Sequence, residues 1–207
     1  MNKSKKNRYV CQRCALEAPT CCRLGHGENA PDGGDCFPLS LKEHSRIEEA
    51  LSEARGKRMD AGAVLLLKNA DAALDAPTGQ KKWAVDEANS PGFIKAMCNL
   101  FPKENERIKG IFPQGESHLR LALSQDGSCA FLSEHGCTLP RKARPSFCRI
   151  FPFWSVHGTL QCFRADDCLA VREHAGNLMA LMGAFDSAPS DVMERYKKLR
   201  KDWGVDV

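Results

Sequence analysis

The chain has 207 residues, 30 of them basic and 26 acidic, which gives a formal net charge of +4. With 43% hydrophobic and 27% charged residues, the composition is that of a globular chain and argues against wholesale disorder or a fibrous protein. The longest apolar run, 61–67, is far shorter than the roughly 20 residues that cross a bilayer, so we expect no membrane association. The basic N-terminus lacks the apolar segment of a secretory signal, which predicts a cytoplasmic protein.

Cysteine is the residue type that departs most from an ordinary composition. Because cytoplasmic thiols are kept reduced, a high cysteine density indicates metal binding or redox chemistry. A disulfide scaffold is the weaker alternative, since the count is odd and a chain of this length does not need covalent staples. The eleven cysteines are Cys11, Cys14, Cys21, Cys22, Cys36, Cys98, Cys129, Cys137, Cys148, Cys162 and Cys168.

The predicted domain plan has three parts. Residues 1–8 form a basic tail, 9–185 a single cysteine-cluster domain, and 186–207 a C-terminal amphipathic helix. Within the domain, 9–36 is a loop-rich cysteine segment that needs no regular structure, and 57–117 is a variable insertion. The tail is short and lacks interleaved aromatic residues, so we expect no nucleic-acid partner.

Start signals predict two helices in the first half of the chain. Ser40 and the glutamate three residues later fit a capping box ahead of a helix over 41–55. Residues 57–89 suggest a helix followed by an exposed loop. Ser90, followed by a proline, then caps a short, largely buried helix that ends before Pro102.

In the second half of the chain, the hydrophobic periodicity changes from helical to the alternation that is typical of strands. Residues 118–140 alternate and contain two turns, which predicts a short antiparallel meander, and a hairpin should turn at His157 and Gly158. Asp166 or Asp167 can cap one helix, and a proline opens the last. Their apolar stripes are Leu178, Leu181, Met182 and Phe185 in the first, and Val192, Tyr196, Leu199 and Trp203 in the second. The predicted class is α+β: a small irregular cysteine-clustered domain with short antiparallel hairpins and several helices around a metal site.

The cysteines fall into two groups separated by a long stretch of ordinary sequence. A CxxC pair allows one metal to take both thiolates, and all-thiolate sites suit zinc or iron–sulfur clusters with four cysteines each. Eight thiolates would therefore be enough for two sites. The spacings are Cys11-x2-Cys14-x6-Cys21-Cys22 and Cys129-x7-Cys137-x10-Cys148, followed by Cys162 and Cys168.

A four-thiolate site has a net charge of about −2, so burying it calls for donors and cations nearby. Arg144 and Arg149 are interleaved with the second cysteine group and are the predicted counter-charges, together with Arg141, Lys142 and Arg164. Cys168 falls in the first turn of the predicted helix, where the helix dipole and free amides should lower its pKa.

These residues resemble a known family. The order CxxC, Cys-Cys, SCAFLSEHGC and ARPSFCRIFPF is similar to the YkgJ-type cysteine-cluster proteins, also described as zinc- or iron-chelating domains. Flagellin lysine N-methylases carry a similar domain. The resemblance covers roughly residues 9–56 and 126–170, and the six-residue spacer before Cys21 departs from the family's compact spacing. It implies a metal-chelating cluster held by Cys11, Cys14, Cys21, Cys22, Cys129, Cys137, Cys148 and Cys168, with Cys162 as a further candidate.

Other notable residues have ordinary explanations. Cys36 and Cys98 are expected to pack as small buried hydrophobes. Arg144 with its following proline either stops a helix and makes a surface salt bridge or supports the metal site. Three histidines lie in glycine-flanked turns, where exposure is the default: His26, His135 and His157.

The sequence leaves three functions open. The first is a binding or electron-transfer module with one or two iron–sulfur clusters and a protein redox partner. The second is a structural zinc domain with the same ligands. The third, supported by the resemblance alone, is an enzyme similar to the lysine N-methylases that acts on a protein substrate. The nucleotide-binding, HExxH, GxSxG and CxxxCxxC motifs that would indicate other enzymes are absent from the sequence.

Overall fold

The computed structural model describes residues 10–16, 22, 38–56, 66, 83–124 and 127–206. Within these ranges the chain forms eight helices and three two-stranded antiparallel sheets, so the predicted α+β class is confirmed at that level. No helix in this part of the chain is long and apolar enough to cross a bilayer. The expectations for the basic tail, for most of the 9–36 segment and for most of 57–82 concern residues outside the described ranges.

Helix α2 (Leu41–Gly56) begins where the capping box predicted it. The Ser40 amide donates to Glu43 Oε2 at 2.9 Å, and the Glu43 amide donates to Ser40 Oγ at 3.2 Å. These reciprocal bonds satisfy amides that the first turn of a helix otherwise leaves unpaired. The helix buries Ile47 and Leu51 against a hydrophobic cluster that also contains Phe131.

Helix α4 (Pro91–Leu100) also confirms its start signals, because Ser90 Oγ accepts from the Phe93 amide at 3.1 Å. Helix α5 (Asn105–Ile111), which the sequence analysis did not predict, follows directly. Both helices bury aromatic or aliphatic side chains in the larger of the two hydrophobic clusters.

The first sheet contains a strand that the sequence did not predict. Residues 84–88, predicted as part of a loop, form strand β1 (Ala84–Ala88). Strand β2 (Ser117–Leu121) pairs with β1, with Ala84 opposite Leu121 and Ala88 opposite Ser117. Directly after β2 the first turn of the predicted meander is present, because Leu123 and Cys129 form an antiparallel bridge and the Ala130 amide donates to Ala122 O at 2.9 Å. The alternation of β2 signalled a strand, but its partner lies across two intervening helices, which a local pattern does not reveal.

The two predicted hairpins are confirmed. Strands β3 (Leu132–Ser133) and β4 (Gly136–Cys137) form the first, and β5 (Phe153–Val156) and β6 (Thr159–Cys162) form the second. The β5–β6 turn has positive φ at both His157 (53°) and Gly158 (79°), the geometry that a two-residue hairpin turn requires.

The single helix predicted after residue 167 is wrong, because the structure contains two. Helix α7 (Leu169–Glu173) has Cys168 as its N-cap, in place of the aspartates proposed from sequence. Helix α8 (Leu178–Ala184) starts anew at Asn177, whose side chain accepts from the Ala180 amide at 2.9 Å. Between them Gly176 adopts φ 79°, which ends the first helix.

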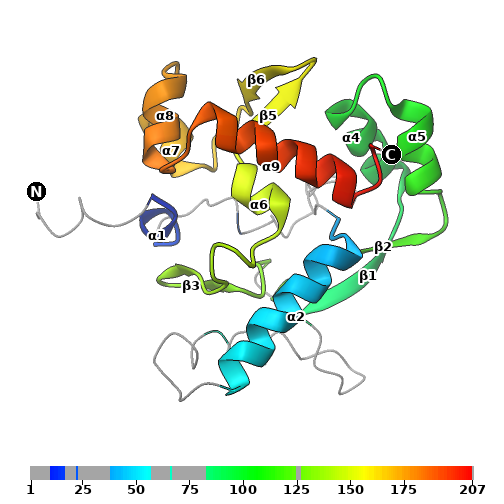
Figure 1. Cartoon of the computed structure of the whole chain (residues 1–207), viewed down its shortest axis with the longest axis horizontal. Coiled ribbons are helices and arrows are strands. Elements are labelled where there is room, and N and C mark those ends of the chain that lie inside the picture. The colour runs from blue at the N-terminus through cyan, green and yellow to red at the C-terminus, as the bar shows by residue number, and fades with distance from the viewer. Residues whose placement is uncertain are drawn as a thin grey trace, which may run out of the picture.

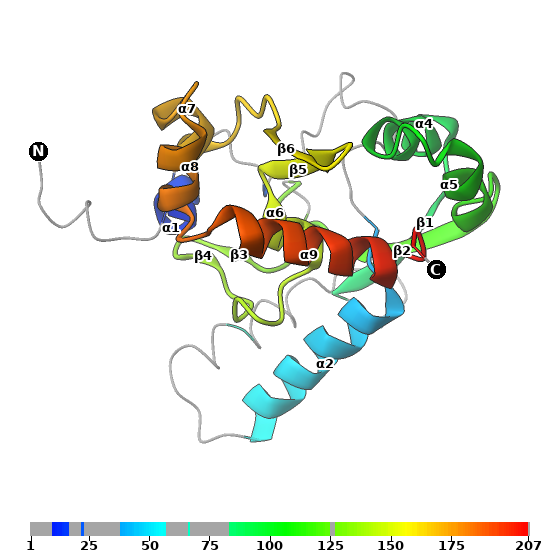
Figure 2. The same cartoon turned by 45° about the horizontal axis from the view of Figure 1, so that its top comes forward.

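Helix α9 (Pro189–Asp202) confirms the predicted amphipathic helix, with Val192, Tyr196, Leu199 and Trp203 buried. It lies across α6 (Ser146–Ile150), as Figures 1 and 2 show, and also contacts β5. This packing creates the larger hydrophobic cluster. The stripe therefore covers the domain's own core.

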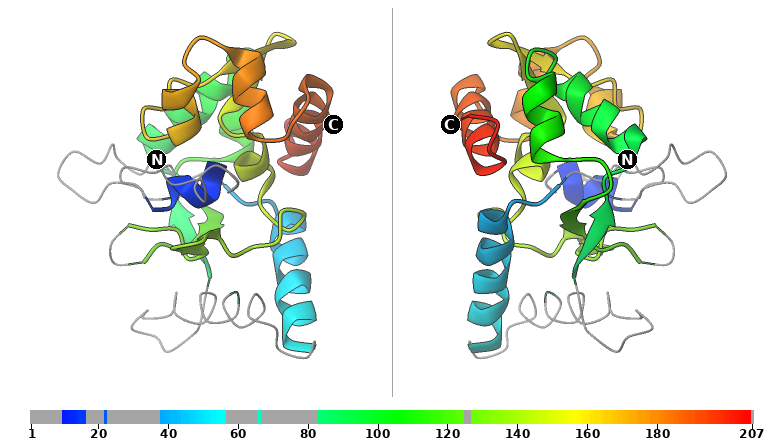
Figure 3. Two further views of the ribbon diagram at one scale, coloured as in Figure 1. Left: turned by 90° about the vertical axis from the view of Figure 1, so that its left-hand side faces the viewer. Right: turned by 90° about the vertical axis from the view of Figure 1, so that its right-hand side faces the viewer.

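Helix α1 (Val10–Cys14) is a five-residue helix within the segment that was expected to lack regular structure. It contacts both α7 and β4. In Figures 1 and 3 it lies below α7 and α8 and above the β3–β4 hairpin. The start of the chain is thereby brought against elements more than 100 residues later in sequence.

Candidate metal centre

Helix α1 is held against the C-terminal half by specific contacts. The Arg13 guanidinium donates through both terminal nitrogens to the two Glu173 carboxylate oxygens, each at 2.7 Å, which fastens α1 to α7. At Gly136 of β4, with φ 92°, an added Cβ would lie 3.4 Å from Cys11 O. The absence of a side chain there allows the backbone of α1 to approach β4, so Cys11 lies close to the strand that carries Cys137.

The adjacent-cysteine motif is tied to the same region. The Cys129 amide donates to Cys22 O at 2.8 Å, a hydrogen bond between residues on opposite sides of the long intervening sequence. Cys21 and Cys36 lie outside the described residues. We call the described cysteines of both groups the thiol region: Cys11, Cys14, Cys22, Cys129, Cys137, Cys148 and Cys168.

The Cys11 thiol is the best-connected group of the thiol region. Burial is the main cause that raises its pKa to about 12, and nearby charge on Cys22, Cys14 and Cys168 acts in the same direction. The Arg144 guanidinium acts in the opposite direction and stabilises the thiolate. Three different segments of the chain therefore bring cysteines within electrostatic reach of Cys11.

Cys137 and Cys148 both interact electrostatically with Cys22. Burial is the main cause that raises the pKa of each, and Cys22 contributes to both. Cys129 is the strongest thiol neighbour of Cys148. The side chain of Cys148 has exposed surface, yet surrounding protein still raises its pKa well above the ordinary value. Cys22 thus interacts with Cys11 as well as with Cys137 and Cys148.

Cys168 shows that burial outweighs the helix start. The nearby backbone amides of Val171 and Ala170 act to lower its pKa, as the sequence led us to expect. Burial at the α7 N-cap is the larger cause, however, and the pKa is raised. The predicted lowering is therefore wrong. Cys162 lies near Cys168, and its sulfur is 3.2 Å from Phe163 O.

The two predicted counter-charges lie in different surroundings. Arg144 donates to Leu139 O at 3.0 Å and to Cys137 O at 3.2 Å, and its charge lowers the pKa of Cys11 and Cys137. The pKa of Arg149 is lowered by burial and then by the charge of three other arginines. Arg144 is thus a neighbour of the thiols, whereas the strongest charged neighbours of Arg149 are cationic.

The structure describes three of the residues for which the sequence predicted packing or exposure in place of metal binding. Cys98 is half-buried at the edge of the larger hydrophobic cluster, with its sulfur 3.9 Å from Asn105 O. His135 and His157 are both exposed. His26 lies outside the described residues.

Glu43 is a residue whose wider role the sequence did not reveal. Besides its capping box, the fully buried carboxylate accepts from the Ser146 amide at 2.6 Å and from Trp203 Nε1 at 3.2 Å. It therefore joins α2 to α6 and to the end of α9. The only sequence signal for Glu43 was the capping box, which accounts for a bond to its own helix but not for these long-range partners.

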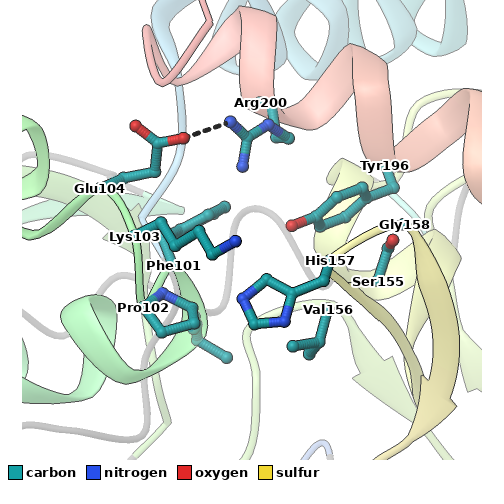
Figure 4. A pocket seen from close by; sticks show the side chains of 11 residues that line it. Phe101, Pro102, Lys103, Glu104, Ser155, Val156, His157, Gly158, Tyr196 and Arg200 are labelled. Carbon is teal, nitrogen blue, oxygen red and sulfur yellow. Dashed lines mark hydrogen bonds and ion pairs between the residues drawn. The ribbon is translucent and has the colours of Figure 1, made fainter.

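A cavity on another part of the molecule lies between α9, the α4–α5 turn and the β5–β6 turn (Figure 4). The side chains of Lys103, His157 and Tyr196 surround it, and Arg200 forms an ion pair with Glu104 at 3.1 Å. None of its lining residues is a cysteine. This cavity is therefore not part of the thiol region.

Within the described ranges, no set of three or more cysteine, histidine, aspartate or glutamate side chains stands ready as a metal-binding group. Comparison of the chain with family models, with curated proteins and with solved structures found no match. The resemblance to the cysteine-cluster family therefore stays a prediction that rests on the residues.

Proposed function

We propose that the chain is a metal-binding protein in which thiolates from both cysteine groups hold one or two iron–sulfur clusters. The observation that carries this proposal is the convergence of the two groups, through contacts of α1 with β4 and α7 and the hydrogen bond between Cys129 and Cys22. Four thiolates are the usual ligand set of such a cluster. Ligands drawn from both ends of the domain would couple folding to metal binding.

The electrostatic neighbours of the thiols support two sites. Cys11, Cys14 and Cys168 interact around α1 and α7. The second set is centred on Cys148 and contains Cys22, Cys129 and Cys137. As the fourth ligand of the first set we propose Cys21, because the resemblance to the cysteine-cluster proteins implies that it is a ligand. Eight thiolates in two sets of four match the requirement of two clusters.

The chemistry of the donors fits a thiophilic metal. Burial keeps the thiols of Cys11, Cys137 and Cys168 protonated at neutral pH in the metal-free chain. A bound metal supplies the positive charge that replaces those protons. Arg144 and the backbone amides that lower the pKa of Cys137 and Cys168 would then stabilise a negatively charged site. When bound, an iron–sulfur cluster supplies a reversible one-electron centre.

Cys148 supports a role in electron transfer. It is the one exposed cysteine among those that the structure describes, and it lies near half-buried members of its set. A centre held in part by Cys148 would have one edge near the surface, where a protein redox partner can approach. Hydrogen bonds and solvent exposure at the sulfurs are the means by which a protein tunes such a centre.

Metal analysis of protein purified without oxygen tests the proposal. Cys14→Ser and Cys148→Ser are each expected to lower iron and acid-labile sulfide, whereas Cys98→Ser, a half-buried cysteine outside the thiol region, leaves both unchanged. A visible absorption band that bleaches on reduction supports the redox role. Stoichiometric zinc in a colourless protein would identify a structural zinc domain instead, and equal metal content in all four proteins would contradict the proposed ligands.

A further inference from the structure

Four arginines from different segments converge beside α6, and we call them the arginine cluster: Arg46 of α2, Arg141 of the β4–α6 connection, Arg149 of α6 and Arg195 of α9. Arg141 and Arg195 donate to the same hydroxyl oxygen, Ser187 Oγ, at 3.2 and 3.5 Å. A shared acceptor places two guanidinium groups side by side.

The packing of α6 brings the other two members to the same place. Helices α6 and α9 are in contact, and Figure 2 shows α6 directly behind α9. Arg46 reaches from α2 and donates to Arg144 O at 3.1 Å, just before α6 begins. All four side chains are half-buried, so they are neither spread over the surface nor removed from it.

Two donors of the arginine cluster lack acceptors. The Nε atoms of Arg46 and Arg149 are inaccessible to solvent and have no hydrogen-bond partner in the described part of the chain. Buried guanidinium donors are ordinarily paired, because their removal from water is otherwise uncompensated. Mutual repulsion adds to this cost, since the charges of Arg195, Arg46 and Arg141 all act on Arg149.

One acidic residue that acts on the cluster is already engaged. Glu43 acts electrostatically on Arg149 and lies 3.9 Å from Arg46. Its Oε1 accepts from the Ser146 amide, and its Oε2 accepts from the Ser40 amide and from Trp203 Nε1. This carboxylate therefore serves the capping and packing of three elements, and the Nε donors of Arg46 and Arg149 stay without an acceptor among the described residues.

We propose that the arginine cluster binds a phosphate-type oxyanion, either free phosphate or the phosphoryl group of a larger molecule. Planar guanidinium groups donate in pairs to such oxygens, and several of them approaching from different elements suit a tetrahedral anion better than a planar carboxylate. The proposal does not depend on metal binding, and Arg149 is the one member of the cluster that adjoins a proposed metal ligand, Cys148.

Titration calorimetry of the full-length protein with inorganic phosphate tests the proposal, with sodium chloride at equal ionic strength as the reference. Arg149→Gln and Arg195→Gln should each weaken phosphate binding by about tenfold or more, because each removes charge-assisted hydrogen bonds. Arg55→Gln removes the same charge from an exposed position on α2 and should leave binding unchanged. Phosphoserine binding more tightly than phosphate would identify a phosphorylated ligand, and the reverse would identify the free ion.

Thermal unfolding in phosphate-free, low-salt buffer separates binding from a structural role. Arg149→Gln should melt at the same temperature as the unmodified protein or higher, because it relieves repulsion. Metal content should be unchanged in Arg195→Gln, which distinguishes failure of this proposal from failure of the metal centre. Equal effects of phosphate and chloride, equal losses in Arg55→Gln, or a lower melting temperature with unaltered phosphate affinity would each overturn it.

Discussion

Helix α9 buries three side chains over fourteen residues, and Trp203 at its C-cap is buried as well, whereas α1 is five residues long and buries Val10 and Cys14. The region around α9 is held by a large hydrophobic cluster whose aromatic rings stack or meet edge to face, as Trp154 does with Tyr196 at 4.9 Å. The thiol region is built from two-residue strands, short helices and half-buried sulfurs. Apolar burial stabilises the first region by itself. The second gathers the thiols that we propose to hold a metal.

The largest expected effect lies on the α9 side. Leu199→Ala removes a side chain with 0% exposure and should lower the free energy of unfolding by about 3 kcal/mol. The loss should be the same with and without a metal chelator, because Leu199 belongs to the hydrophobic cluster. Urea unfolding measures it, with Lys197→Ala on the exposed face of α9 as the neutral control. A loss confined to metal-loaded protein would show that the two regions are not independent.

Glu43 links the two regions through α6 and gives the next effect. Glu43→Gln replaces a buried charged acceptor of amide and indole donors and should cost about 2 kcal/mol of unfolding free energy. Glu49→Gln, at an exposed position of the same helix, should cost almost nothing. Equal stability of the two variants in urea unfolding would refute the role given to Glu43.

The pH dependence of the metal-free protein should reveal the buried thiols. The pKa of Cys11 rises from 9.0 to about 12 on folding, so between these values the folded chain keeps a proton that the unfolded chain has released. Stability is therefore complete below pH 9 and falls as pH rises, by about 1.4 kcal/mol per pH unit for each such thiol.

Urea unfolding at about pH 8 and about pH 10 measures this slope. Metal-loaded protein should show a smaller slope, because its ligating thiols carry no proton in the folded state. Cys11→Ser should also reduce the slope of the metal-free chain. An equal fall in stability for metal-free protein and for Cys11→Ser would exclude Cys11 as a buried titrating group.

The smallest expected effect on stability concerns the ion pair between Arg13 of α1 and Glu173 of α7. Arg13→Ala breaks the paired hydrogen bonds with Glu173, which lie near the surface, and should cost less than about 1 kcal/mol. A double-mutant cycle with Glu173→Ala isolates the coupling energy. The variant should nevertheless weaken metal retention, since α1 carries Cys11 and Cys14. If Arg13→Ala lost metal to a chelator at the same rate as the unmodified protein, the Arg13–Glu173 pair would not position the thiols.

Local chemistry explains which parts of the fold could be predicted from sequence. The cap at Ser40, the cap at Ser90 and the turn at His157 were found because their signals lie within a few residues of the structure they specify. The pairing of β1 with β2 and the interruption at Gly176 were missed. The first is a contact across two helices, and the second is a glycine with positive φ between two short helices that contact each other.

The candidate site, like the fold, could be predicted where the signal is local in sequence and not where it depends on packing between distant elements. Cysteine spacing selected the residues of the thiol region, and the position of Arg144 between two of them indicated its place beside the sulfurs. Cysteine spacing could not predict that Arg144 and Arg149 have different neighbours. Arg144 donates to Cys137 O, whereas the strongest charged neighbours of Arg149 are other arginines, and this difference depends on the packing around α6. Nor could spacing reveal that burial exceeds the effect of the helix start at Cys168, since burial depends on the whole domain.

Amide hydrogen exchange on metal-loaded and chelator-treated protein tests the central claim most directly. If thiolates from both cysteine groups hold a metal, removing it should strip protection from α1 and from residues 129–148 while α4 and α9 keep theirs. Unchanged protection of α1 and 129–148 after complete removal of metal would contradict the claim.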